Sequence, residues 1–242
     1  MSDTVTLHVA DGIATITLDR PGARNAMDPA MVAALADRVG QCDADAAVRV
    51  IVLTGAGAHF CAGLDLGAGW ATDLATLAGE GVEARCAPAR ARKPLIGAVR
   101  GAAIGAGAEL MLMCDLVVVG DDLRFALPEF GMGALPVTGA VARLSARIGA
   151  MRAADLIVSG RSVGGAEARA LGLAVSVHAP DALIDAAHAL AAPIARQSTA
   201  HAVLLKQALG EAGGAADASA SALRAMAALS ITMMQRKTEH GA

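Results

Sequence analysis

Residues 93–115 read KPLIGAVRGAAIGAGAELMLMCD, and this stretch decides the fold. A buried strand pattern at 94–99 is followed by a glycine-rich turn and by an apolar run that contains one carboxylate, Glu109. A charge among apolar neighbours costs free energy unless it is paired, protonated or used in chemistry. On the local sequence alone, Glu109 either interacts with a helix N-terminus, worth about 0.3–1 kcal/mol, or takes part in catalysis.

The residues at the beginning of the chain predict a hairpin and a helix. Apolar and polar residues alternate at 4–9 and 13–19 around Asp11-Gly12, which is a β-hairpin signal. A helix is expected at 29–42, with Asp28 as its N-cap and a proline in its first turn.

Two further strands and a helix lie on either side of the quoted stretch. Residues 48–54 and 116–119 are β-branched, apolar runs of the kind that is buried on both faces of a sheet. A helical segment is expected at about 70–91. Because strands, glycine loops and helices alternate throughout this half, the sequence predicts α/β architecture.

From residue 137 onward the pattern becomes helical. We expect a short strand at 173–177 and helices at 137–147, 150–158, 166–171, 181–195, 198–210 and 217–236. The linker-like stretch GEAGGAADASAS at 210–221 is too short to separate domains. The sequence therefore predicts a main domain of residues 1–195 and a helical C-terminal region of residues 196–242.

The composition argues against several classes of protein. The net charge is −3, the aromatic fraction is 2% and tyrosine is absent, so we expect no nucleic-acid partner and no binding to an anionic membrane. The apolar region 95–119 contains Arg100, Glu109 and Asp115, and such charges cost about 2.5–3.5 kcal/mol each at mid-membrane. The first residues, MSDTVTLHVADG, lack a basic n-region and an apolar core. We therefore expect a soluble, cytoplasmic protein.

The sequence also lacks the usual signatures of cofactor and metal sites. The four cysteines form no C-x-x-C pair and the six histidines no ligand spacing, so we expect reduced thiols and no metal. The glycine loops complete neither a G-x-G-x-x-G fingerprint nor a P-loop, and no G-x-S-x-G is present.

Five motifs in a fixed order resemble the crotonase, or enoyl-CoA hydratase/isomerase, superfamily. One is the opening stretch, and the others are RPGARNAM (20–27), GAGAHFCAGLDL (55–66), FALPEFGMGALP (125–136) and GRSVGGAEARALGLA (160–174). The resemblance implies a spiral of repeated β-β-α units whose C-terminal helices form a homotrimer or a dimer of trimers. It also implies an acyl-CoA thioester substrate, with coenzyme A as part of the substrate and no separate cofactor.

The resemblance assigns the reacting groups of the site. The backbone N–H groups of Leu64 and Ala106 would hold the thioester oxygen, provided that Ala106 has a negative φ. Glu109 would activate a water and Glu129 would protonate C2, which is the arrangement of a hydratase that adds water to a 2-trans-enoyl-CoA. Members that resemble isomerases keep only the second glutamate. An isomerase, another crotonase reaction and a catalytically weak acyl-CoA-binding paralogue remain alternatives.

Other residues are expected around CoA and the acyl group. By resemblance these are Ala23, Arg24, Ala62, Asp65 and Val137. Arg24 fits the CoA phosphates, although a plain surface arginine is nearly as good an interpretation, and Asp65 fits a structural hydrogen-bond acceptor better than a chemical group. Val137 stands where hydratases have a glycine whose amide lies near the water, so its side chain is expected to crowd that water.

Two polar residues near these motifs have simpler interpretations. Asp115 follows the quoted helix and is expected to accept a structural hydrogen bond at a strand end. His59 lies in the second glycine loop and is expected to be solvated.

Overall fold

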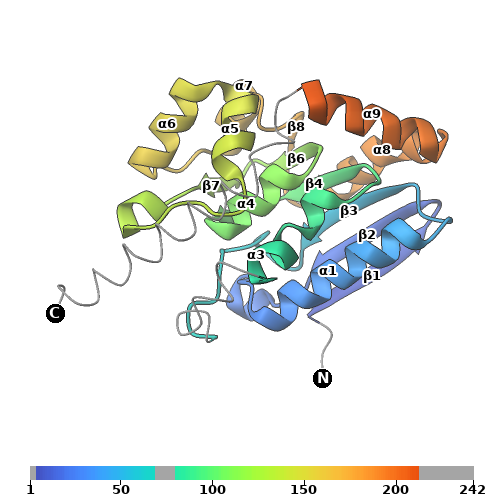
Figure 1. Cartoon of the computed structure of the whole chain (residues 1–242), viewed down its shortest axis with the longest axis horizontal. Helices are drawn as coiled ribbons and strands as arrows, with labels where there is room; N and C mark the ends of the chain where they lie inside the picture. Colours follow the sequence, from blue (N-terminus) through green and yellow to red (C-terminus); the bar gives the residue numbers. More distant parts are fainter. Residues whose placement is uncertain (1–3, 69–79, 213–242) are drawn as a thin grey trace.

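The computed structural model describes residues 4–68 and 80–212, which form a layered α/β structure (Figure 1). Its main sheet has the strand order β1-β2-β3-β4-β6-β8. The strands are β1 (Val5–Ala10), β2 (Ile13–Leu18), β3 (Val50–Gly55), β4 (Leu95–Val99), β6 (Leu116–Gly120) and β8 (Ser176–His178). Only β1 and β2 are antiparallel, and every later pair in the main sheet is parallel.

The N-terminal hairpin and the first helix form as predicted. Asp11 and Gly12 both have positive φ, +51° and +79°, which is the conformation that a two-residue hairpin turn requires. Helix α1 (Pro29–Ala44) begins after Asp28, whose carboxylate accepts the N–H of Met31 at 2.7 Å. This bond satisfies one of the free N–H groups of the first turn.

A second, two-stranded sheet is the feature that the sequence did not predict. It pairs β5 (Ala102–Ile104) with β7 (Arg124–Ala126) in parallel. Three residues are too few to display an alternating pattern, so neither strand can be detected from periodicity. Each follows a strand of the main sheet, β4 or β6, and precedes a helical segment, so the chain repeats a β-β-α unit.

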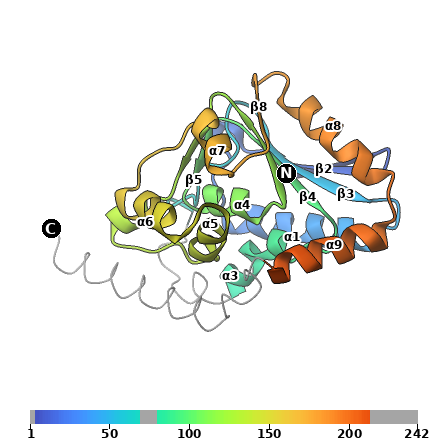
Figure 2. The same ribbon diagram turned by 90° about the horizontal axis from the view of Figure 1, so that it is seen from above.

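Helices cover both faces of the main sheet (Figure 2). Ile51 and Leu53 of β3 belong to the large core cluster, which also includes buried residues of α1. Val50 and Val52, on the opposite face, pack in a second cluster with α8 (Leu183–Ala195). The predicted run of apolar residues in this strand is therefore buried on both faces, as expected for a parallel sheet.

Four of the remaining helices agree with the predictions within a few residues: α5 (Ala140–Ile148), α6 (Ala150–Ser159), α7 (Gly165–Leu171) and α9 (Thr199–Ala212). The described part of the helical segment expected at 70–91 forms two short helices, α3 (Glu80–Arg85) and η3 (Ala87–Arg90). The structure also has α4 (Ala106–Met113) within the quoted stretch and η4 (Glu129–Met132), for which no helix bounds were predicted. The strand expected at 173–177 begins later, at Ser176, because Leu173 and Ala174 pack into the core after the end of α7. The helix expected at 217–236, and residues 70–79 of the segment expected at 70–91, lie outside the described residues.

Helix α9 is tied to the core through one lysine. The ammonium group of Lys206 lies 2.8 Å from the Asp115 carboxylate and 3.1 Å from the carbonyl oxygen of Lys93. The division between residues 195 and 196 coincides with the end of α8 and stays a prediction. None of the helices within 4–68 and 80–212 is long and apolar enough to cross a membrane.

Candidate active site

Helix α4 brings the candidate carboxylate into the middle of the molecule. Every residue from 107 to 113 is buried, and Glu109, in the first turn, is 3% exposed. The turn before the helix depends on Gly105, which has a φ of +55°. A Cβ at this position would lie 3.1 Å from Oε1 of Glu129, so the glycine lets the second glutamate lie against the start of α4.

The second glycine loop is joined to β5 next to this helix. The N–H of Cys61 donates to the carbonyl of Ala102 at 2.9 Å, and the N–H of Ile104 donates to the carbonyl of Cys61 at 3.1 Å. A Cβ on Gly63, which has a φ of +103°, would lie 2.9 Å from the Ile104 oxygen and 3.7 Å from the Ala106 nitrogen. The loop and the beginning of α4 can approach so closely only because position 63 carries no side chain.

The two predicted amides are placed in these adjoining segments. Leu64 follows Gly63, and Ala106 is the first residue of α4, where an N–H group has no partner inside the helix. Within the described part of the chain, neither amide donates a hydrogen bond. Ala106 is not among the described non-glycine residues with positive φ, so its backbone meets the requirement of a negative φ stated above. Both N–H groups are available to a ligand oxygen.

Glu109 lies where its carboxylate is supported by polar groups. Its Oε1 accepts the N–H of Thr138 at 2.8 Å. Burial raises the pKa of Glu109, and this N–H and the nearby positive charges of Arg85 and Arg143 act in the opposite direction. Burial at this position therefore disfavours the ionised carboxylate of Glu109, whereas the neighbouring N–H and guanidinium groups stabilise it.

Glu129, at the start of η4, has fewer such supports. Burial and, to a smaller extent, the neighbouring charge of Glu109 raise its pKa to about 7. Its Oε2 is buried and has no hydrogen-bond partner among the described residues. A carboxyl group with this pKa is about half protonated at pH 7, which would suit the predicted role of a general acid.

The residue before Thr138 was expected to act near the water. Val137 is half-buried and packs against the core, and its predicted role stays a prediction. The adjacent amide, that of Thr138, is the one that contacts Glu109. The sequence assigned no role to Thr138, Arg85 or Arg143, because each of them comes near Glu109 only through the folding of segments that are far apart in the sequence.

Asn25 holds the loop around the Leu64 amide in place. Its side chain is fully buried, and its Nδ2 donates to the carbonyls of Ala56 at 3.0 Å and His59 at 2.6 Å. Its Oδ1 accepts the N–H of Arg20 at 2.9 Å. The motif RPGARNAM had no assigned role for this asparagine, and the structure shows that it joins two loops of the site.

Arg20 adds an ionic connection to the same loops. Its guanidinium lies 3.0 Å from Asp65 and 3.2 Å from Asp28, and it also donates to the carbonyl of Ala26 at 2.6 Å. Asp65 thus accepts a structural hydrogen bond, as expected.

The remaining residues expected around CoA lie beside this frame. Ala23 is the last residue of the short η1 helix (Pro21–Ala23), and Arg24 follows it. The carbonyl of Arg24 accepts the N–H of Ala62 at 3.0 Å. The Arg24 side chain is exposed. The predicted CoA contacts of Ala23, Arg24, Ala62 and Asp65 remain predictions.

One of the two simpler interpretations was wrong. The N–H of Ala102 donates to Nδ1 of His59 at 3.2 Å, and the ring is half-buried. His59 is therefore part of the connection between the glycine loop and β5 and is not solvated. Asp115 accepts the N–H of Leu95 at 2.7 Å, as expected for an acceptor at a strand end.

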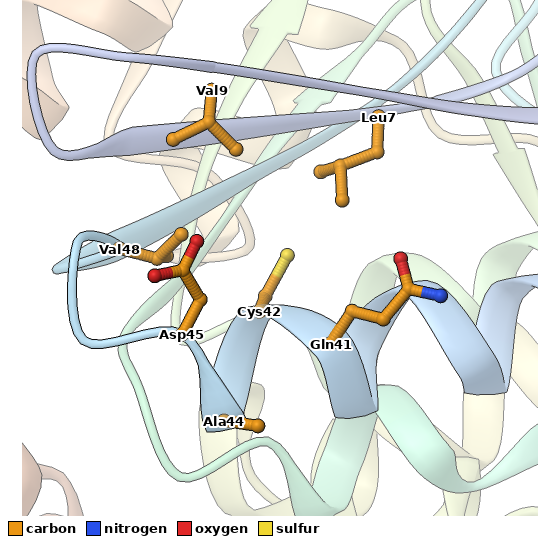
Figure 3. Close-up of a pocket in the computed structure, with 7 residues that line it drawn as sticks. All are labelled: Leu7, Val9, Gln41, Cys42, Ala44, Asp45 and Val48. Atoms are coloured by element: carbon orange, nitrogen blue, oxygen red, sulfur yellow. The ribbon is translucent and has the colours of Figure 1, made fainter.

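A larger groove elsewhere does not offer comparable chemistry (Figure 3). It has a volume of about 400 Å³ and lies between β1 and the C-terminal end of α1. Its potential nucleophile is Cys42, but burial raises the pKa of this thiol to about 11. Among the described residues, no cluster of three or more histidine, cysteine, aspartate or glutamate side chains is arranged to hold a metal.

A smaller cavity adjoins the site itself. It is lined by Met27, Val32, Leu35, Arg85, Ala106, Leu110, Met113 and Thr138. Thr138 thus borders both the cavity and the carboxylate of Glu109, and Arg85 is the charged residue in an otherwise mainly apolar lining.

Two backbone amides without a partner among the described residues, and two carboxyl groups with raised pKa values, would suit a reaction at a carbonyl or thioester group. Residues 8–241 match the family described as Enoyl-CoA hydratase/isomerase, and the chain belongs to this family. It is a crotonase-family acyl-CoA enzyme, and an acyl-CoA substrate is implied by the family.

Known relatives include both hydratases and an isomerase. The chain is 38% identical over 195 residues to 2,3-dehydroadipyl-CoA hydratase of Escherichia coli (strain K12), which covers 80% of this chain and 76% of the relative. It is 35% identical over 223 residues to 1,2-epoxyphenylacetyl-CoA isomerase of the same organism, covering 88% and 84%. The crystal structure of a probable enoyl-CoA hydratase from Mycobacterium smegmatis matches with a TM-score of 0.85 at 28% identity, covering 98% and 97%. The predicted family and the crotonase fold are thereby confirmed.

Proposed function

We propose that this protein is an enoyl-CoA hydratase that adds water to a 2-trans-enoyl-CoA and yields a 3-hydroxyacyl-CoA. The observation that carries the proposal is the pair of glutamates. Glu109 is supported as a carboxylate by the Thr138 N–H at 2.8 Å, and Glu129 has a pKa of about 7 and no partner on its buried oxygen. One base and one acid are what the addition of water requires.

The proposed reaction assigns each group one task. The Leu64 and Ala106 amides hold the thioester oxygen, and the positive end of the α4 dipole favours the negative charge that develops there. Glu109 takes a proton from water while the water oxygen bonds to C3. The π electrons move toward the thioester oxygen, and Glu129 gives its proton to C2. The proton on Glu109 returns to Glu129 through solvent, so that the net reaction consumes one water.

The small cavity beside Ala106 and Thr138 has a volume of about 10 Å³, room for about one water molecule and not for an acyl chain. The substrate panel should include an acid-terminated acyl group. The relative named 2,3-dehydroadipyl-CoA hydratase supports this choice.

A test is to incubate the purified protein with a chain-length series of 2-enoyl-CoAs and with 2,3-dehydroadipyl-CoA. Loss of the conjugated thioester absorbance and identification of a 3-hydroxyacyl-CoA by mass spectrometry are expected. Tight acyl-CoA binding with no conversion of any substrate would instead support the paralogue that only binds.

An isomerase is the second candidate, and the relative named 1,2-epoxyphenylacetyl-CoA isomerase supports testing it. It needs the amides and Glu129 but not a water held by Glu109. Conversion of a 3-enoyl-CoA that survives Glu109→Gln would favour this function. The proposed homotrimer or dimer of trimers is checked by light scattering.

A further inference from the structure

Thr138 is held from two sides by groups that lie far apart in the sequence. Its N–H donates to Glu109, and its carbonyl oxygen accepts Nη1 of Arg143 at 2.5 Å. The thiol of Cys86 lies 3.9 Å from the same carbonyl oxygen. Glu109 is thus connected to helix α5 through the backbone of a single residue.

Arg143 occupies a position that is unfavourable unless it serves this contact. It lies in the first turn of α5, where the helix dipole disfavours a cation by about 0.3–1 kcal/mol. Burial lowers the pKa of its guanidinium, so the charge is also poorly solvated. Gly139 makes room for it, because a Cβ there would lie 2.5 Å from Nη1.

Arg147 shows what a half-buried arginine on the same helix does without this contact. It lies one turn further along α5 and donates to the carbonyls of Leu112, at 3.0 Å, and Cys114, at the end of α4. Burial lowers its pKa as well. Glu109 is not among its charged neighbours, so Arg147 joins two helices and leaves the carboxylate alone.

The charged and titratable groups around Glu109 come from three other elements. Arg85 of α3 faces it, followed by the Cys86 thiol, whose pKa is raised by burial so that it stays neutral. Glu129 of η4 interacts with it electrostatically. Arg143 carries a positive charge and also donates a hydrogen bond to Thr138, whose amide contacts the carboxylate.

We infer that Arg143 is a positioning residue for the reaction: it fixes the Thr138 backbone that orients Glu109, and its half-buried charge favours the ionised form of that carboxylate. The inference rests on the proposed function for its kinetic part only. The orientation and ionisation of Glu109 can be measured whether or not water is added to any substrate.

Two substitutions separate the two effects. Arg143→Gln removes the charge, so kcat should fall about 10- to 100-fold, the order expected for a catalytic group displaced by a fraction of an ångström to 1 Å. KM should change much less, and the acidic limb of the kcat/KM profile should move to higher pH. Arg143→Lys keeps a cation but loses the planar guanidinium, so kcat should fall while the acidic limb stays near its wild-type pH.

Arg147→Gln is the matched control. It should lower the melting temperature at least as much as Arg143→Gln and leave the acidic limb unchanged. The inference would be overturned if Arg143→Gln kept the wild-type kcat and the wild-type acidic limb of the kcat/KM profile. It would also be overturned if Arg147→Gln shifted that acidic limb as far as Arg143→Gln does. If Arg143→Gln does not fold, a wild-type kcat in Arg143→Lys would overturn it as well.

Carboxyl-carbon NMR on the same proteins distinguishes this inference from the proposed function. With glutamate labelled by 13C, Arg143→Gln should raise the titration midpoint of Glu109 and Arg147→Gln should not. That result in a protein that hydrates no substrate would leave the role of Arg143 standing and reject only the hydratase. An unchanged midpoint in an active hydratase would reject the role of Arg143 alone.

Discussion

Glu109 and Glu129 have the same side chain but lie in different surroundings. Glu109 lies on a helix that is buried from residue 107 to residue 113, accepts a backbone N–H and faces two guanidinium groups. Glu129 begins a short 3-10 helix beside the exposed Phe130 and Met132, and its buried Oε2 has no partner among the described residues. The difference teaches that the proton of a carboxyl pair is placed by the hydrogen-bond donors and cations around it, and not by burial alone.

The largest expected effect is the loss of either carboxyl group. Glu109→Gln and Glu129→Gln should each lower hydration about 10²- to 10⁴-fold, the usual contribution of a general acid or base. Steady-state rates with the best 2-enoyl-CoA measure this effect, and circular dichroism checks the fold. A Glu109→Gln variant that hydrates at the wild-type rate would remove the distinction between the two residues.

Removal of one amide should have the next largest effect. Ala106→Pro deletes the N–H at the first helical position, where proline is tolerated. Loss of one donor to an oxyanion should lower kcat about 10²- to 10³-fold, with a melting temperature close to that of the wild type. An active Ala106→Pro enzyme would show that the thioester oxygen binds elsewhere.

The pH dependence tests the two surroundings directly. Because Glu129 must be protonated to donate and its pKa is about 7, kcat/KM should fall as the pH rises through about 7. Because Glu109 must be ionised and burial raises its pKa, the acidic limb should lie above the usual range of a glutamate. A flat profile from pH 5 to 9 would contradict both assignments. The two apparent pKa values of this profile belong to the interacting pair of glutamates and not to either residue alone.

Disruption of the loop frame should have a smaller effect, mainly on stability. Asn25→Asp replaces the Nδ2 donor that serves the carbonyls of Ala56 and His59, leaving buried groups unsatisfied at a cost of about 1–3 kcal/mol each. Asn25→Gly is the matched variant, since it keeps the φ of +55° without strain while losing the same bonds. Urea denaturation compares them, and an unchanged midpoint in both would show that Asn25 does not hold the loops.

The sequence predicts the parts of this site that lie in contiguous motifs. Both glutamates and the Leu64 and Ala106 amides follow from short patterns, and the main-sheet strands follow from apolar runs. The strands β5 and β7 did not, because three residues carry no period. Arg143, Thr138 and the ring of His59 act through contacts between distant segments, and local sequence does not encode such contacts.

The most direct test of the division between the two glutamates is a carboxyl-carbon NMR titration of the free enzyme. The two signals are assigned by their disappearance in Glu109→Gln and Glu129→Gln. At a pH where the pair holds one proton, the account predicts that Glu129 carries it, with a midpoint near 7, and that Glu109 is ionised. A protonated Glu109 beside an ionised Glu129 would contradict it.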